Sequence, residues 1–157
     1  MKKDYHVHLH GCLSPEDLFR FGKESYKTRA PYLAWYEREY EKAWERKPCG
    51  SDYFEKENGF ELLKNDYLFT RTGSFSQFQA CFNLIIALCP IETNRFHVQE
   101  HIIKKMNEEG LDLFEARTVI PYRFNQEETL EYLKGLSSLV KDLNEKLPMT
   151  TKLVITL

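Results

Sequence analysis

A run of alternating histidines at residues 5–11 (YHVHLHG) constrains the fold and the chemistry of this chain more than any other stretch. In an extended strand alternate side chains share one face, so His6, His8 and His10 are expected to point to the same side of a sheet. Neutral imidazole is the commonest protein ligand for zinc and similar divalent ions. The pattern predicts a strand that ends in a metal site; the alternative is a half-buried strand with purely structural histidines.

The residues after this strand predict a turn into a helix. Gly11 permits a tight turn or the close approach of a ligand. Ser14 is a suitable N-cap and Pro15 a suitable first helical residue, with Asp17 at the capping-box position. A strand that ends in ligands and turns into a capped helix is typical of a βα unit that carries a functional site.

Residues 4–18 resemble the first strand of the adenosine deaminase family, metal-dependent hydrolases built on a TIM barrel that open with a His-x-His-x-Asp/Glu-Gly pattern and a proline-containing helix start. The resemblance implies that His6 and His8 bind a divalent metal, with zinc as the expected ion, and that Gly11 lines the nucleoside site. His10 stands where the family has an acidic residue that contacts the ribose. We therefore expect His10 to contact substrate and to change the sugar preference.

A second point of resemblance lies in the helix predicted over residues 75–89, whose apolar residues recur at helical spacing. In the deaminases the helix at this place in the order forms an apolar wall over the purine. By position Phe75, Phe78 and Phe82 match that wall and are expected to bind substrate. The alternative is an ordinary stripe that faces the core.

The third point of resemblance is the strand predicted at residues 111–121, because its Glu-x-Arg sequence is similar to the family's second strand. Glu115 and Arg117 share one face of this strand. Both faces of a parallel strand are normally covered, so a charged pair there needs partners or a function. We interpret the pair first as an ion pair that braces a barrel and second as a substrate contact.

Strands that alternate with helices predict an α/β protein with three parallel strands, near the start, at 111–121 and at 151–157. With the resemblance, this is the amino-terminal part of a TIM (β/α)8 barrel, with several helices inserted after the first strand. We expect residues 1–157 to form a single partial domain in which 27–72 is a helical insertion. Further helices are expected at 14–26, 31–47, 93–109 and 126–147.

Composition excludes several classes of function. The net charge of −2 suggests no basic surface that would bind nucleic acid or a membrane. No apolar run is long enough to span a membrane, so we expect a cytoplasmic protein. Tyr36, Tyr40 and Trp44 recur every four residues among balanced charges, which favours packing over base stacking. The cysteines show no metal or redox spacing and are expected to be reduced thiols: Cys12, Cys49, Cys81 and Cys89.

The resemblance implies hydrolytic deamination of a purine nucleoside or a related amine by metal-activated water. It spans less than half of a complete deaminase, and the remaining catalytic groups are expected beyond Leu157. We therefore expect an amino-terminal fragment that is inactive alone, and whose open sheet edge pairs with the carboxy-terminal half of the barrel or with a second copy.

Three alternatives remain open at this point. One is a hydrolase of the same superfamily that acts on another amine or amide. Another is a non-catalytic half-barrel that binds a partner through its open edge and the stripe of Tyr36, Tyr40 and Trp44. The last is a zinc protease, because residues 97–101 fit the inverted motif His-x-x-Glu-His, with His97, Glu100 and His101 as its functional residues.

Overall fold

The computed structural model describes residues 2–69, 72–89, 96–120 and 124–156, apart from the side chains of residues 5–7 and 10. Within these ranges the protein is α/β, with seven α-helices and a three-stranded parallel sheet. The chain divides into two compact units. We call residues 1–12 and 91–157 the sheet unit, and residues 13–90 the helical unit.

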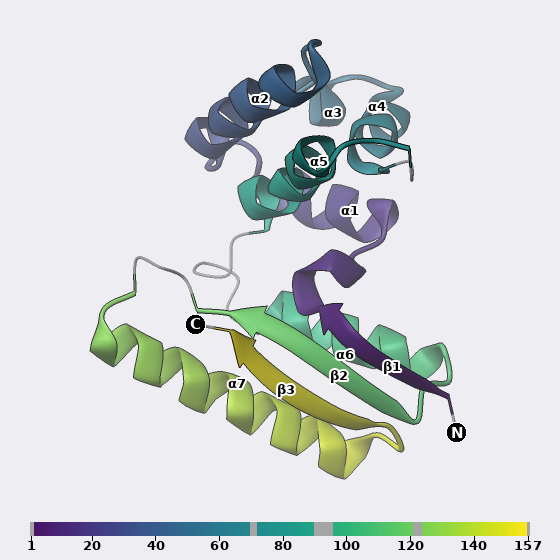
Figure 1. The fold of residues 1–157 in the computed structure, drawn as a ribbon, viewed down its shortest axis with the longest axis vertical. Helices are drawn as coiled ribbons and strands as arrows, with labels where there is room; N and C mark the ends of the chain where they lie inside the picture. The colour runs from purple at the N-terminus through teal and green to yellow at the C-terminus, as the bar shows by residue number, and fades with distance from the viewer. Residues whose placement is uncertain (1, 70–71, 90–95, 121–123, 157) are drawn as a thin grey trace. The chain divides into compact units, whose positions relative to one another are not determined.

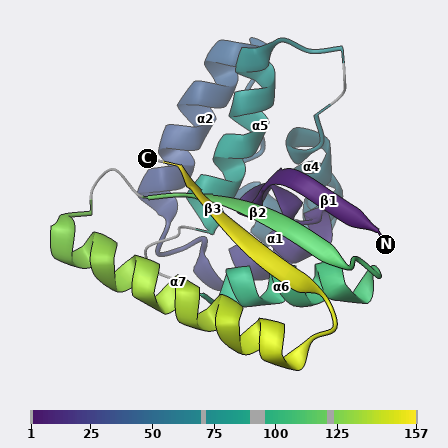
Figure 2. The same cartoon turned by 60° about the horizontal axis from the view of Figure 1, so that its bottom comes forward.

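The sheet unit has its three strands in chain order. β1 (Lys3–His8) pairs in parallel with β2 (Leu113–Val119), which pairs in parallel with β3 (Thr150–Thr156). Helix α6 (His97–Glu108) precedes β2, and α7 (Gln126–Lys146) connects β2 to β3. Both helices cover the same face of the sheet (Figure 1, Figure 2). We call the opposite face the open face.

The side chains of β2 alternate between these two faces. Phe114, Ala116 and Thr118 are buried on the face that the helices cover, and the Thr118 hydroxyl lies 3.0 Å from the hydroxyl of Tyr132 on α7. The intervening residues point to the open face and are partly or fully exposed. The core of this unit therefore lies between the sheet and the two helices.

Helix α7 is tied to its surroundings at both ends. Asn125 is the N-cap: its side chain accepts from the backbone N–H of Glu128 at 2.9 Å, and the Glu128 carboxylate accepts from the Asn125 N–H at 2.8 Å. In the last turn of α7, Asn144 binds both backbone groups of Thr151. Its Oδ1 accepts from the N–H at 2.7 Å and its Nδ2 donates to the C=O at 3.0 Å.

The helical unit consists of α1 (Pro15–Ser25), α2 (Ala30–Trp44), α3 (Asp52–Glu55), α4 (Gly59–Tyr67) and α5 (Phe75–Leu88). Ser14 is the predicted N-cap of α1 and accepts from the Asp17 N–H at 3.2 Å. Helices α2 and α5 lie side by side (Figure 2). The buried Arg29 guanidinium donates to the carbonyls of Ile86 and Ala87, where it complements the carboxyl end of the α5 dipole.

The predicted strands and helices are confirmed within a few residues, and the sheet is parallel as expected. Within the stretch 27–72, expected to be a helical insertion, the structure has α2, α3 and α4. None of the helices in the described ranges is long and apolar enough to cross a membrane.

The double contact of Asn144 predicts a clear stability effect. Asn144→Ala removes both hydrogen bonds and leaves the Thr151 backbone groups without them, so we expect a loss of about 1–2 kcal/mol in the free energy of unfolding. Urea denaturation followed by circular dichroism measures this loss. Glu145→Ala, an exposed neighbour on the same helix, is the matched control and should change stability by less than about 0.5 kcal/mol.

Candidate functional site

The carboxyl end of β1 carries the residues that the sequence assigned to a metal site. His8 is the last residue of the strand, and its side chain is exposed. Gly11 follows in a 3₁₀ helix, η1 (Leu9–Cys12), and is also exposed. Both residues therefore lie where parallel α/β sheets place ligands, beyond the carboxyl ends of their strands.

The prediction that His10 extends the strand is wrong. The strand ends at His8, and His10 lies in η1, so the alternation of a strand does not continue to it. The reason is local: Leu9 is fully buried, and η1 packs against α6 and β2. Whether His10 contacts substrate stays a prediction, because its side chain is outside the described part of the structure, as is that of His6.

Arg117 is the neighbour of His8 across the sheet. The two residues are register partners on β1 and β2, and both lie on the open face. Glu115 lies on the same face of β2, and its Oε1 is 3.9 Å from Arg117 Nη2. The predicted ion pair is therefore present, but it is longer than the 2.7–2.9 Å or so of a charge-assisted hydrogen bond.

The metal site itself stays a prediction. Among the described side chains, no three of the types His, Cys, Asp and Glu come together around a possible ion. His8 belongs to those side chains and His6 does not. Cys12 donates from Sγ to the His8 carbonyl at 3.6 Å, and burial, with Asp4 and Glu109 nearby, raises the pKa of its thiol to about 12.

The glutamate of the alternative zinc-protease motif, residues 97–101, forms an ion pair within its own helix. Glu100, its proposed general base, forms an ion pair with Lys104 at 2.6 Å, and this hydrogen bond lowers the pKa of the carboxyl. A lower pKa makes the carboxylate a weaker base. His97, Glu100 and His101 are all described residues, and no group of three side chains that could hold a metal ion is found in the described part of the chain.

The three predicted substrate-binding phenylalanines lie on α5 in the helical unit, so they and His8 belong to different units. Phe75 is 77% exposed, Phe78 is 43% exposed, and Phe82 is partly buried. Their rings form a row, with centroids 6.2 Å apart from Phe75 to Phe78 and 6.4 Å apart from Phe78 to Phe82. The alternative that this stripe faces the core is wrong for Phe75 and Phe78. Other α5 residues face the core: Ala80, Cys81, Leu84, Ile85, Ala87 and Leu88.

Beside Phe75 a groove of about 380 Å³ runs between α2 and α5. Its lining includes Lys42 of α2 and Ala80 and Asn83 of α5. The volume falls in the range of small-ligand sites, roughly 300–1,000 Å³. Of the predicted site residues whose side chains the structure describes, Phe75 alone lines the groove.

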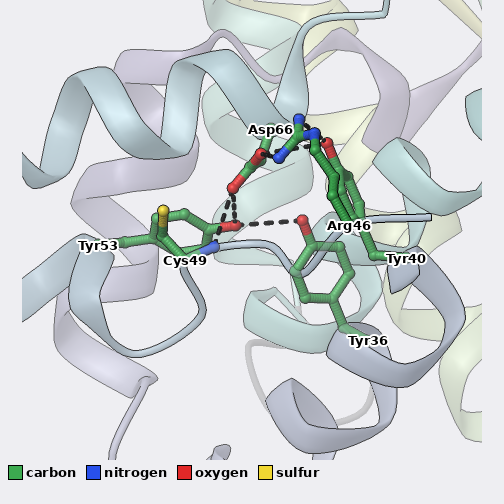
Figure 3. Close-up of polar contacts among 6 residues, drawn as sticks. All are labelled: Tyr36, Tyr40, Arg46, Cys49, Tyr53 and Asp66. Atoms are coloured by element: carbon green, nitrogen blue, oxygen red, sulfur yellow. Dashed lines mark hydrogen bonds and ion pairs between the residues drawn. The ribbon is translucent and has the colours of Figure 1, made fainter. Parts of the chain in front are cut away.

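A buried polar cluster in the helical unit was not predicted from the sequence (Figure 3). At its centre Asp66, 2% exposed, accepts from the hydroxyls of Tyr40 at 3.1 Å and Tyr53 at 2.8 Å. It also accepts from Arg46 Nη1 at 2.7 Å and from the backbone N–H of Cys49 at 3.0 Å. These groups come from α2, α3, α4 and the segment after α2, so one carboxylate joins most of the unit.

The tyrosines of this cluster are structural donors. Tyr36 donates to or accepts from Tyr53 at 3.2 Å, and burial raises the pKa of both phenols well above their ordinary value. Burial likewise raises the pKa of Tyr40. The three phenols therefore stay protonated, and Tyr40 and Tyr53 keep donating to Asp66. Because Tyr36 and Tyr40 are buried, the predicted packing role of their stripe is confirmed, and these two side chains offer no binding surface.

Comparisons with known proteins add no relative. No family model, no curated protein and no solved structure matches the chain. The resemblance to the adenosine deaminases therefore depends on the residues of the chain alone.

The Asp66 cluster predicts a large effect from a small change. Asp66→Asn removes the charge that faces Arg46 and places an amide donor among groups that donate. We therefore expect a loss of about 2–3 kcal/mol in the free energy of unfolding. This loss is smaller than that for a fully buried ion pair, because the Arg46 side chain is half exposed. Chemical denaturation measures it. Asp52→Asn is the control: its pair with Lys56 is on the surface, and the expected loss is below about 0.5 kcal/mol. Equal effects of the two variants would contradict a central role for Asp66.

Proposed function

We propose that this chain supplies the first three strands of a (β/α)8 barrel, and that the complete barrel is a metal-dependent aminohydrolase similar to the adenosine deaminases. The observation that carries the proposal is the position of His8. It is exposed at the carboxyl end of the first strand of a parallel sheet, directly before a 3₁₀ turn that contains Gly11.

The order of the strands supports a barrel over a doubly wound sheet. In a doubly wound sheet the strand order reverses at a switch point, and helices cover both faces. In the described residues the order is β1-β2-β3, and α6 and α7 cover one face only. This is the arrangement at the start of a barrel, where every helix lies outside and the open face points inward.

The sheet unit also has the unpaired edges that a barrel would close. In the described part of the chain β1 and β3 each pair only with β2, so each has one free edge. Free edges associate with other strands unless something covers them. We propose that the remaining strands of the barrel occupy these edges. A non-catalytic half-barrel that binds a partner through the β3 edge is the alternative that the same observation supports.

In the proposed site His6 and His8 hold the ion. When bound, zinc lowers the pKa of water and so supplies the nucleophile for hydrolytic deamination at neutral pH. Gly11 leaves room for the substrate close to the backbone, and His10 would contact a purine nucleoside or a related amine. The acid and base groups of the deamination are assigned to no residue of this chain, so the chain alone is expected to be inactive.

Zinc titration of the 157-residue chain tests the proposal. We expect one zinc ion per chain, and more than about a tenfold loss of affinity in His6→Ala or His8→Ala, because each removes an imidazole ligand. His97→Ala is the matched control and should bind zinc like the unchanged chain. If zinc binding instead depends on His97 and not on His8, the protease alternative is favoured and the proposal is wrong.

Ammonia release tests the reaction. When the strands that close the barrel are supplied, we expect ammonia from adenosine or a related amine, and none from His8→Ala. Release that is unchanged in His8→Ala would contradict the role of this residue.

A further inference from the structure

Arg117 carries a feature that the proposed deamination does not use. Its Nε is buried and has no hydrogen-bond partner. The one ion pair it makes, with Glu115, is long at 3.9 Å. A buried Nε–H without an acceptor costs stability, so an acceptor at this position would stabilise the site.

The charges around Arg117 define which acceptor would fit. By the register of the sheet, Lys3, Glu115, Arg117 and Lys152 all lie on the open face. Three of these are cations and one is a carboxylate. The net positive charge of this face favours an anion.

The position of Arg117 connects this charge to the proposed metal site. Arg117 is the register partner of His8, and neighbouring strands lie only about 4.8 Å apart. An anionic group held by Arg117 would therefore lie beside the exposed imidazole of His8. A planar guanidinium binds carboxylates and phosphates through two parallel hydrogen bonds, so it fixes both position and orientation.

We infer that Arg117 is a specificity-determining residue that binds a carboxylate or phosphate group of the substrate. This inference rests on the proposed function and narrows its substrate to an amine that carries such an anionic group. Glu115 has a second role in this arrangement. It lies beside Arg117 on the same strand and competes with the substrate anion for the guanidinium.

Anion binding by the metal-free 157-residue chain tests the inference. Calorimetric titrations at low ionic strength would use inorganic phosphate in one arm and acetate in the other; the anion that binds more tightly identifies the substrate group. We expect Arg117→Gln to weaken binding roughly tenfold or more, and Arg117→Lys to weaken it by a smaller factor, because lysine keeps the charge and loses the fork. Arg38→Gln, at an exposed arginine of α2, should leave the affinity within about twofold.

Glu115→Gln keeps the test decisive if Arg117→Gln fails to fold. Because it removes the competing carboxylate, it should tighten anion binding by a few fold, a direction that loss of structure cannot produce. Weak binding of both anions, an affinity that is unchanged in Arg117→Gln, or equal loss in Arg38→Gln would overturn the inference.

The outcomes also separate this inference from the proposed function. Anion binding that depends on Arg117 in a chain that binds no zinc would support the anion site and contradict the deaminase. Zinc binding that depends on His8, with anion binding that does not change in Arg117→Gln, would support the proposed metal site and contradict the anion site.

Discussion

Parallel pairing of β1, β2 and β3 in chain order is the constraint on which the sheet unit depends. Parallel strands cannot be joined by tight turns, so each connection needs a crossover: the crossover from β1 to β2 contains α6, and the crossover from β2 to β3 contains α7. Because both helices bury the same face, Phe114 and Ala116 are fully covered, while Glu115 and Arg117 remain on the open face. The same register brings His8 beside Arg117. The register of the parallel sheet thus places the residues of the proposed metal site and of the proposed anion site next to each other.

The helical unit depends on a different interaction. Asp66 accepts four hydrogen bonds in a buried site, and the donors come from α2, from α3 and from the segment between these helices. A buried carboxylate is stable only when donors and a counter-charge surround it, and Arg46 supplies that charge from the rim. The cluster therefore favours one arrangement of α2, α3 and α4, and we assign it a structural role.

Much of the fold could be predicted from local signals. Asn125 and Ser14 are strong N-caps, and the structure uses both as caps. The strands at β2 and β3 follow from short apolar runs between helices. Tyr36 and Tyr40 were expected to pack because their spacing places them on one face of a helix, and both are buried.

The parts that could not be predicted depend on contacts distant in sequence. Nothing around Asp66 indicates a buried carboxylate, because its donors lie up to 26 residues away. His10 shares the alternation of His6 and His8, yet burial of Leu9 against the core ends the strand before it. Phe75 and Phe78 have the spacing of core residues, but smaller residues of α5 fill the core instead.

X-ray absorption on the zinc-loaded chain tests the central claim, that the end of β1 binds metal through imidazole, most directly. The account predicts nitrogen or oxygen neighbours at about 2.0–2.1 Å with the outer-shell scattering of imidazole rings, and loss of part of that scattering in His8→Ala. A shell of sulfur at about 2.3 Å would instead point to a thiol such as Cys12 and would contradict the account.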